Sequence, residues 1–279
     1  MPTTHNGDIE LYYETFGLPV DGAEDPAIIC LPGMGNQLLV YPEEFCLALV
    51  DRGFFVIRMD NRDAGLSAKT DASLAYTLSD MAADTVAVLD AAGVGHAVVL
   101  GLSLGGMIAQ QTAVEHPDRL RALVSLASST GEPDLPPATD EVVAALLKAS
   151  EDTIEAQIEA DLEARRLWSN PDWFDEAQLR AYFRALYERS FDPGGGLRQY
   201  EAAMRTPSRV EALGRLAIPT LVVHGGSDTL LRPEHGQRTA AVIPGAEYLE
   251  IEEFSHDFVY QVWPALIEAT TALTARTFA

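Results

Sequence analysis

The stretch Gly101-Leu102-Ser103-Leu104-Gly105-Gly106 decides how this sequence is interpreted. It follows an apolar run at residues 97–100 that predicts a buried strand, and it precedes a helical pattern at residues 107–115. A serine between a strand and a helix lies on a tight turn, where small residues two positions away on each side permit strained backbone angles. Its hydroxyl then projects above the sheet as a candidate nucleophile. The alternative is a glycine-rich turn for close helix packing, or an anion site at a helix N-terminus.

Apolar runs of strand length recur along the chain, and segments with helical spacing lie between most of them. Residues 78–92 form one such helical segment, which Gly93 closes. Continuously apolar strands separated by helices indicate an α/β fold with a mostly parallel, doubly wound sheet. Residues 9–16 have no helix after them, so we expect antiparallel strands at the N-terminal edge. The apolar runs lie at residues 27–31, 54–59, 97–101, 120–126 and 218–224.

The strand pattern is absent from residues 133–212, where helical spacing takes over. We expect a core domain formed by residues 1–132 and 213–279, with residues 133–212 inserted as a helical cap or lid. Trp168, Trp173 and Phe174 surround a predicted loop of this insertion and are candidates for lining a substrate pocket. For most of its aromatic residues, a place in the insertion's own core is an equally good explanation.

The base that a serine nucleophile needs is best supplied by His256. A serine hydroxyl is a poor nucleophile at neutral pH, so the hypothesis requires a histidine base and a carboxylate that orients it. His256 lies in a loop after the strand-like residues 248–251 and before the C-terminal helical run. A catalytic base that comes late in the sequence is expected in such a loop.

The acid is predicted to be Asp228, which lies just beyond the carboxyl end of the strand at residues 218–224. Open α/β sheets hold their sites at this end of their strands. A local role as a turn or helix-cap residue is the alternative for Asp228. Asp257 adjoins His256, so its side chain is expected to point away, and Asp134 would serve only if the acid followed the preceding strand. Both rank below Asp228.

The order Ser103, Asp228, His256 and the turns that hold these residues resemble the α/β-hydrolase superfamily over nearly the whole chain. The resemblance implies a sheet of about eight strands, a Ser-His-Asp triad, and no metal or cofactor. Residues 60–67, Asp-Asn-Arg-Asp-Ala-Gly-Leu-Ser, resemble a turn of the family that we take as structural. A weaker resemblance, carried by residues 29–31 and 59–63, is to the aclacinomycin methylesterase-like hydrolases.

The same resemblance implies an oxyanion hole. Pro32-Gly33-Met34-Gly35 follows the strand at residues 27–31, where such enzymes usually carry His-Gly and a residue whose N–H binds the oxyanion. By that match the backbone N–H groups of Met34 and Leu104 are the two donors, each worth on the order of 3 kcal/mol to the transition state. Pro32 stands in place of the usual histidine, a departure that bears on the geometry of this loop.

The implied activity is hydrolysis of a carboxylic ester, through an acyl-enzyme, on a small or medium-sized apolar substrate. A thioesterase, lactonase, C–C bond hydrolase or perhydrolase would use the same three residues. A non-catalytic ligand-binding homologue is the alternative outside enzymes. Epoxide hydrolases and haloalkane dehalogenases are disfavoured, because they need a carboxylate where Ser103 stands.

Composition narrows the class of partner. The formal net charge of −23 repels nucleic-acid backbones and anionic lipid headgroups, so we expect a small-molecule substrate and neither nucleic acid nor membrane as partner. The sequence leaves open whether the protein forms a homodimer. Cys30 and Cys46 have no Cys/His cluster beside them, which favours free buried thiols over a metal site. The N-terminus lacks a signal-peptide pattern, which predicts a cytoplasmic protein.

Overall fold

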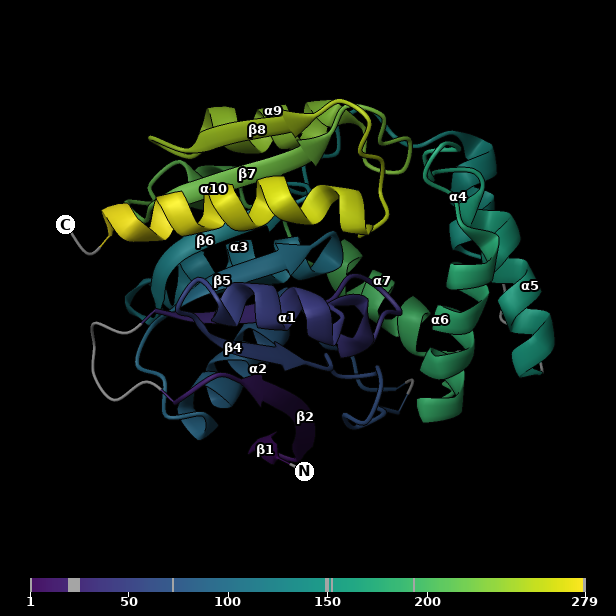
Figure 1. The fold of residues 1–279 in the computed structure, drawn as a ribbon, viewed down its shortest axis with the longest axis horizontal. Coiled ribbons are helices and arrows are strands. Elements are labelled where there is room, and N and C mark those ends of the chain that lie inside the picture. Colours follow the sequence, from purple (N-terminus) through teal and green to yellow (C-terminus); the bar gives the residue numbers. More distant parts are fainter. Residues whose placement is uncertain are drawn as a thin grey trace.

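A central sheet of eight strands, in the order β1-β2-β4-β3-β5-β6-β7-β8, forms the middle of the molecule (Figure 1). The computed structural model describes residues 2–19, 26–71, 73–148, 151, 153–192 and 194–277. β1 pairs antiparallel with β2 and β2 with β4, and the pairings from β4 to β8 are parallel. The predicted parallel sheet and antiparallel edge are both confirmed. The strands are β1 (Thr3–Asn6), β2 (Ile9–Phe16), β3 (Ala27–Leu31), β4 (Phe55–Met59), β5 (Ala97–Leu102), β6 (Leu120–Leu126), β7 (Thr220–Gly225) and β8 (Glu247–Ile251).

Helices cover both faces of the sheet, because alternate residues of each strand point to opposite sides. Ile29 and Leu31 of β3 pack in the core cluster of α2 and α3, whereas Ile28 and Cys30 pack in that of α1 and α10. Figure 1 shows α1 and α10 in front of the sheet. Burial on both faces explains why the strands are continuously apolar. The helices of the core are α1 (Glu43–Val50), α2 (Leu78–Ala91), α3 (Leu104–Glu115), α9 (Pro233–Val242) and α10 (Trp263–Arg276).

Local sequence sets the ends of α2. The carboxylate of Asp80 accepts both the backbone N–H of Thr77, at 2.8 Å, and the Thr77 hydroxyl, at 2.9 Å. The first of these bonds satisfies the N–H of the residue that precedes the helix, which has no partner within the helix. Gly93 follows the helix with a φ of 71°, a conformation that glycine adopts without strain. The helix predicted for residues 78–92 therefore forms almost as expected.

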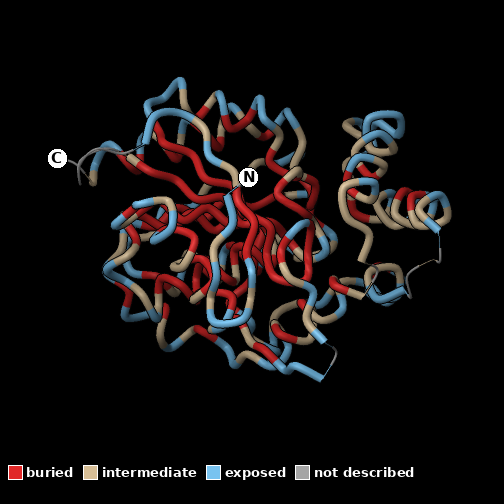
Figure 2. The backbone as a smooth tube through the Cα atoms, turned by 90° about the horizontal axis from the view of Figure 1, so that it is seen from below, coloured by how far each residue is buried: buried red, intermediate tan, exposed pale blue. Residues whose placement is uncertain are grey.

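Between β6 and β7 the described residues form five helices, which we call the helical insertion: α4 (Asp140–Leu146), α5 (Ile154–Arg165), α6 (Glu176–Arg189), α7 (Gly195–Arg205) and α8 (Val210–Leu213). α4, α5 and α6 stand away from the sheet (Figure 1). They have a small core of their own around Ile158, Leu162 and Phe183. Figure 2 shows most buried residues in the sheet and its covering helices, with short buried stretches in the separate group.

The turn at residues 60–67 ties the insertion to the core. Asp60, which is fully buried, pairs with Arg189 at the end of α6, with 2.7 Å between carboxylate and guanidinium. Asp63 pairs in the same way with Arg198 of α7 at 3.0 Å. Both carboxylates of this turn therefore reach into the insertion, which gives the segment a structural role.

One sequence-based expectation concerns the two cysteines. Cys30 and Cys46 are buried free thiols, as predicted. Burial raises the pKa of Cys46 to about 12, so it stays protonated and unreactive at neutral pH.

Among the helices in the described part of the chain, none combines the length and the apolar character needed to cross a bilayer.

Candidate active site

Ser103 lies on the turn between β5 and α3 with backbone angles of φ 55° and ψ −117°, which are rare for a residue with a side chain. Glycines two positions away on each side make this turn feasible. A Cβ at Gly101 would overlap the backbone carbonyl of Gly105, and a Cβ at Gly105 would overlap the carbonyl of Leu31. The glycine pattern of the sequence is therefore a steric requirement of the turn.

A continuous chain of hydrogen bonds links Ser103 to His256 and Asp228. Nε2 of His256 lies 3.0 Å from Oγ of Ser103, and Nδ1 lies 2.7 Å from Oδ2 of Asp228. The other carboxylate oxygen, Oδ1, accepts the backbone N–H groups of Leu230 and Leu231, each at 2.9 Å. His256 and Asp228 are buried, whereas Ser103 is half-buried. The structure thus brings together three residues that lie far apart in sequence and leaves the hydroxyl accessible.

The two competing acids lie elsewhere. Asp257 points away from the imidazole of His256, and its carboxylate bonds to the guanidinium of Arg165 and the hydroxyl of Ser169. Asp134 is an exposed residue after β6. Asp228 is thus the acid that contacts His256.

A second histidine, His224 at the end of β7, borders the acid. Its Nε2 lies 2.7 Å from the carbonyl of Leu231 and 3.6 Å from Oδ2 of Asp228. The short contact to a carbonyl places the proton on Nε2. Burial lowers the pKa of this fully buried ring, against the opposing effect of the Asp228 charge. His224 is therefore an uncharged imidazole that lies beside the carboxylate of Asp228.

The backbone groups predicted to form an oxyanion hole flank the serine. Leu104 is the first residue of α3, where helix geometry leaves the N–H without an intrahelical acceptor. The loop at residues 32–35 also lies beside the serine, since a Cβ at Gly33 would contact the Cβ of Ser103 at 3.4 Å. Met34, the next residue, lines the neighbouring cavity.

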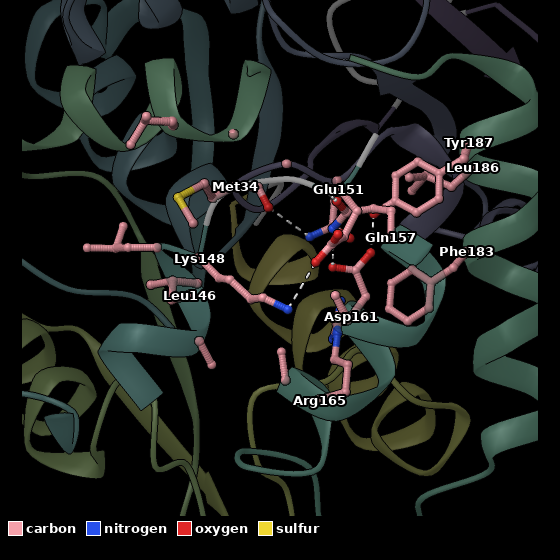
Figure 3. A pocket seen from close by; sticks show the side chains of 18 of the residues that line it. Met34, Leu146, Lys148, Glu151, Gln157, Asp161, Arg165, Phe183, Leu186 and Tyr187 are labelled. Atoms are coloured by element: carbon pink, nitrogen blue, oxygen red, sulfur yellow. Dashed lines mark hydrogen bonds and ion pairs between the residues drawn. The ribbon is translucent and has the colours of Figure 1, made fainter. Parts of the chain in front are cut away.

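A cavity of about 610 Å³ lies between the helical insertion and the loop that carries Met34 (Figure 3). Ser103, Asp228 and His256 are not among its lining residues; it adjoins them through Trp168, whose carbonyl lies 3.5 Å from the backbone N of His256. Apolar and polar side chains share its lining. The apolar ones are Met34, Leu146, Leu147, Trp168, Phe183, Leu186, Tyr187, Phe191, Leu197 and Tyr200.

Of the three aromatic residues predicted to line a pocket, Trp168 lines this cavity and the other two do not. Trp173 packs against the core cluster on the α1 and α10 face. Phe174 packs in the insertion's own core, where the guanidinium of Arg166 lies 5.0 Å from the ring centroid. Their positions depend on how the loop crosses from the insertion to the core, which the local sequence pattern does not contain.

A polar side of the cavity was missed by sequence reasoning. Asp161 accepts hydrogen bonds from Nε2 of Gln157, at 3.0 Å, and from the hydroxyl of Tyr187 (Figure 3). Burial raises the pKa of Asp161. Arg165 lines the same side. Nowhere in the described residues do three His, Cys, Asp or Glu side chains converge in a way that would hold a metal ion.

Comparisons with known proteins identify similar chains and a matching family model. A family model described as the alpha/beta hydrolase fold matches residues 26–261. A rhodomycin D methylesterase from Streptomyces peucetius is 31% identical, over 98% of each chain. A putative carbamate hydrolase from Azorhizobium caulinodans is 29% identical, over 92% of each chain. An enol-lactonase from Burkholderia xenovorans LB400 superposes with a TM-score of 0.82 at 23% identity, covering 98% of this chain and all of the other.

Proposed function

The chain belongs to the α/β-hydrolase fold family, and on that premise we propose that it hydrolyses a carboxylic ester with Ser103 as nucleophile, His256 as base and Asp228 as orienting acid. The observation that carries the proposal is the chain of hydrogen bonds from Oγ of Ser103 through the imidazole to the buried carboxylate. The methylesterase among its relatives supports an ester as the substrate.

Each of these side chains has a role in the proposed reaction. Oγ of Ser103 attacks the ester carbonyl while Nε2 of His256, 3.0 Å away, accepts its proton. Asp228 holds Nδ1–H and stabilises the imidazolium that forms. The Leu230 and Leu231 N–H groups keep the carboxylate in that orientation.

Charge that develops on the carbonyl oxygen is stabilised by the backbone N–H groups of Met34 and Leu104. Collapse of the tetrahedral intermediate breaks the ester C–O bond, and the alcohol leaves with the proton that His256 returns. An acyl group then remains on Ser103. Water attacks this acyl-enzyme with His256 again as base, which releases the acid and regenerates the serine.

The size of the cavity suggests which part of the ester it holds. A volume of about 610 Å³, lined by aromatic, aliphatic and charged side chains, suits a bulky acyl group with both apolar and polar parts. The methylesterase relative favours a small alcohol on the other side of the bond. We therefore propose a methyl or similarly small ester of a large carboxylic acid that carries both apolar and polar groups, with the helical insertion as the cap that excludes water.

Turnover on a substrate panel tests this proposal. Methyl, ethyl and p-nitrophenyl esters of aromatic acids are compared with a thioester, a lactone and a carbamate, using the wild type, Ser103→Ala and the control Asp134→Asn. We expect ester hydrolysis that Ser103→Ala abolishes and Asp134→Asn leaves unchanged. Faster turnover of the thioester, lactone or carbamate would assign the same triad to that bond. Undiminished turnover in Ser103→Ala would refute the proposal.

A further inference from the structure

Gln199 of α7 connects the helical insertion to two loops of the core. The side chain is fully buried. Its Oε1 accepts the backbone N–H of Gly35 at 2.8 Å, and its Nε2 donates to the carbonyl of Arg62 at 2.8 Å. Both polar ends are therefore used, and one of them holds the loop that carries Met34.

Two glycines at the start of α7 bring the helix close enough for these bonds. A Cβ at Gly195 would overlap the carbonyl of Asp63, and a Cβ at Gly196 would lie 3.6 Å from the Cα of Gly35. Gln199 follows these glycines by three and four residues, so it lies on the same face of the helix. In Figure 1, α7 is the helix of the insertion that adjoins the core, whereas α4 and α5 stand away from it.

Four hydrogen bonds of the described residues hold the loop at residues 33–36. Two lie within the loop: the backbone N–H of Asn36 donates to the carbonyl of Gly33 at 3.1 Å, and Nδ2 of Asn36 donates to the carbonyl of Met34 at 3.2 Å. The other two come from the insertion. The N–H of Gly35 donates to Gln199, and the hydroxyl of Tyr182 donates to Oδ1 of Asn36 at 2.9 Å. Of these two, the bond to Gln199 is the one made to the backbone next to Met34.

These bonds fix the direction of the Met34 amide. A trans peptide is planar, and its C=O and N–H groups point in opposite directions. The peptide after Met34 is held at its carbonyl by Asn36 and at its N–H by Gln199. The peptide before Met34 carries the implied oxyanion donor and is held at the carbonyl of Gly33. Release of the Gly35 N–H would leave the peptide after Met34 held at its carbonyl alone, which gives the adjoining Met34 N–H more freedom to leave the oxyanion position.

We propose that Gln199 is a positioning residue for the oxyanion hole, which makes the hole dependent on the contact between α7 and the core. The inference rests on the proposed function and adds to it a residue of the insertion. Loss of an oxyanion donor lowers kcat by 10²–10³-fold in known enzymes, and misplacement by about 1 Å costs up to about 10²-fold. Substrate binding in the cavity does not use this donor, so KM changes little.

The test compares Gln199→Leu with Thr206→Val in steady-state hydrolysis of a p-nitrophenyl ester. Leucine has a similar size and makes neither hydrogen bond. Thr206 follows the other end of α7, where its Oγ1 accepts the N–H of Leu78 at 3.0 Å, so Thr206→Val removes a bond between the insertion and the core without touching the Met34 loop. We expect Gln199→Leu to lower kcat at least about tenfold with KM within about twofold, and Thr206→Val to leave both unchanged. Thermal unfolding confirms that each variant is folded.

Each outcome decides the matter. Unchanged kcat in Gln199→Leu, beside normal turnover in the wild type, would overturn this inference alone. An equal loss in Thr206→Val would overturn it as well, because general loosening of the insertion would then explain both. A wild type without ester turnover would remove the proposed function and this inference with it. If Gln199→Leu does not fold, Gln199→Asn, which is polar but too short to make both bonds, takes its place with the same expectation.

Discussion

Arg165 of α5 and the buried carboxylate of Asp257 form an ion pair that joins the helical insertion to the loop carrying His256. The hydroxyl of Ser169 donates to the same carboxylate, and the N–H of Asn170 donates to Oγ of Ser255 at 3.0 Å. The segment after α5 therefore fixes the residues on both sides of the imidazole. Arg165 also lines the cavity, so the ion pair connects the cavity wall to the loop that carries His256.

Replacement of Asp257 by asparagine is expected to destabilise the protein by about 2 kcal/mol, because the partly buried guanidinium of Arg165 loses the carboxylate that it is bonded to. Urea unfolding measures the change. Glu155→Gln, which breaks an exposed ion pair between α5 and Arg184 of α6, is the matched control and is expected to have a much smaller effect. Equal losses of stability in the two variants would show that the pair of Arg165 and Asp257 contributes no more to the unfolding free energy than an exposed pair does.

Acid is expected to destabilise the wild type partly through His224. Burial lowers the pKa of this histidine in the folded state, whereas the unfolded chain takes up the proton near the ordinary value of about 6.5. Below that pH the unfolded state binds more protons, so the unfolding free energy falls by up to ~1.4 kcal/mol per pH unit. In His224→Gln this contribution is gone. Urea unfolding at pH 7.5 and 5.5 should show a smaller loss in the variant, and an identical loss would contradict this reading of the ring.

The turn that carries Ser103 should not tolerate a methyl group at Gly105. The added Cβ would overlap the carbonyl of Leu31, so Gly105→Ala forces β3 and α3 apart. We expect a loss of more than about 3 kcal/mol, or a failure to fold. Gly95→Ala is the control, because a Cβ there would meet open space, and we expect it to change stability by less than about 0.5 kcal/mol. Comparable chemical stability of the two variants would mean that the turn is less tightly packed than described.

Asp228→Asn should reduce kcat by about 10²–10⁴-fold, because the imidazole of His256 loses the carboxylate that fixes its tautomer and stabilises its cation. Initial rates on a p-nitrophenyl ester measure this effect, with the exposed Asp134→Asn as control. A larger loss in Asp134→Asn than in Asp228→Asn would move the acid to the end of β6.

Much of the fold could be predicted because its strands are buried on both faces and end in turn residues. The strands at β3, β4, β5, β6 and β7 lie within two residues of the apolar runs, since continuous apolarity is a local property of the sequence. Ser103 could be singled out for a related reason. The glycines that its turn needs are its immediate neighbours.

The remainder of the site depends on contacts between distant segments. Trp168 lines the cavity while Trp173 and Phe174 do not, although all three lie in one short stretch, because the path of the loop decides which ring turns inward. Gln199 and Asp161 belong to no sequence motif that would have singled them out. Each is significant only because α7 or α5 places it against another part of the chain.

Intact-mass analysis after treatment with a fluorophosphonate tests the central claim most directly, because the reagent reports an activated serine whatever the substrate is. The wild type, Ser103→Ala and His256→Ala are compared, each shown by circular dichroism to be folded. We predict one adduct on the wild type and none on either variant. An unmodified wild type, or an adduct that survives in folded Ser103→Ala, would contradict the assignment of Ser103 as a nucleophile activated by His256.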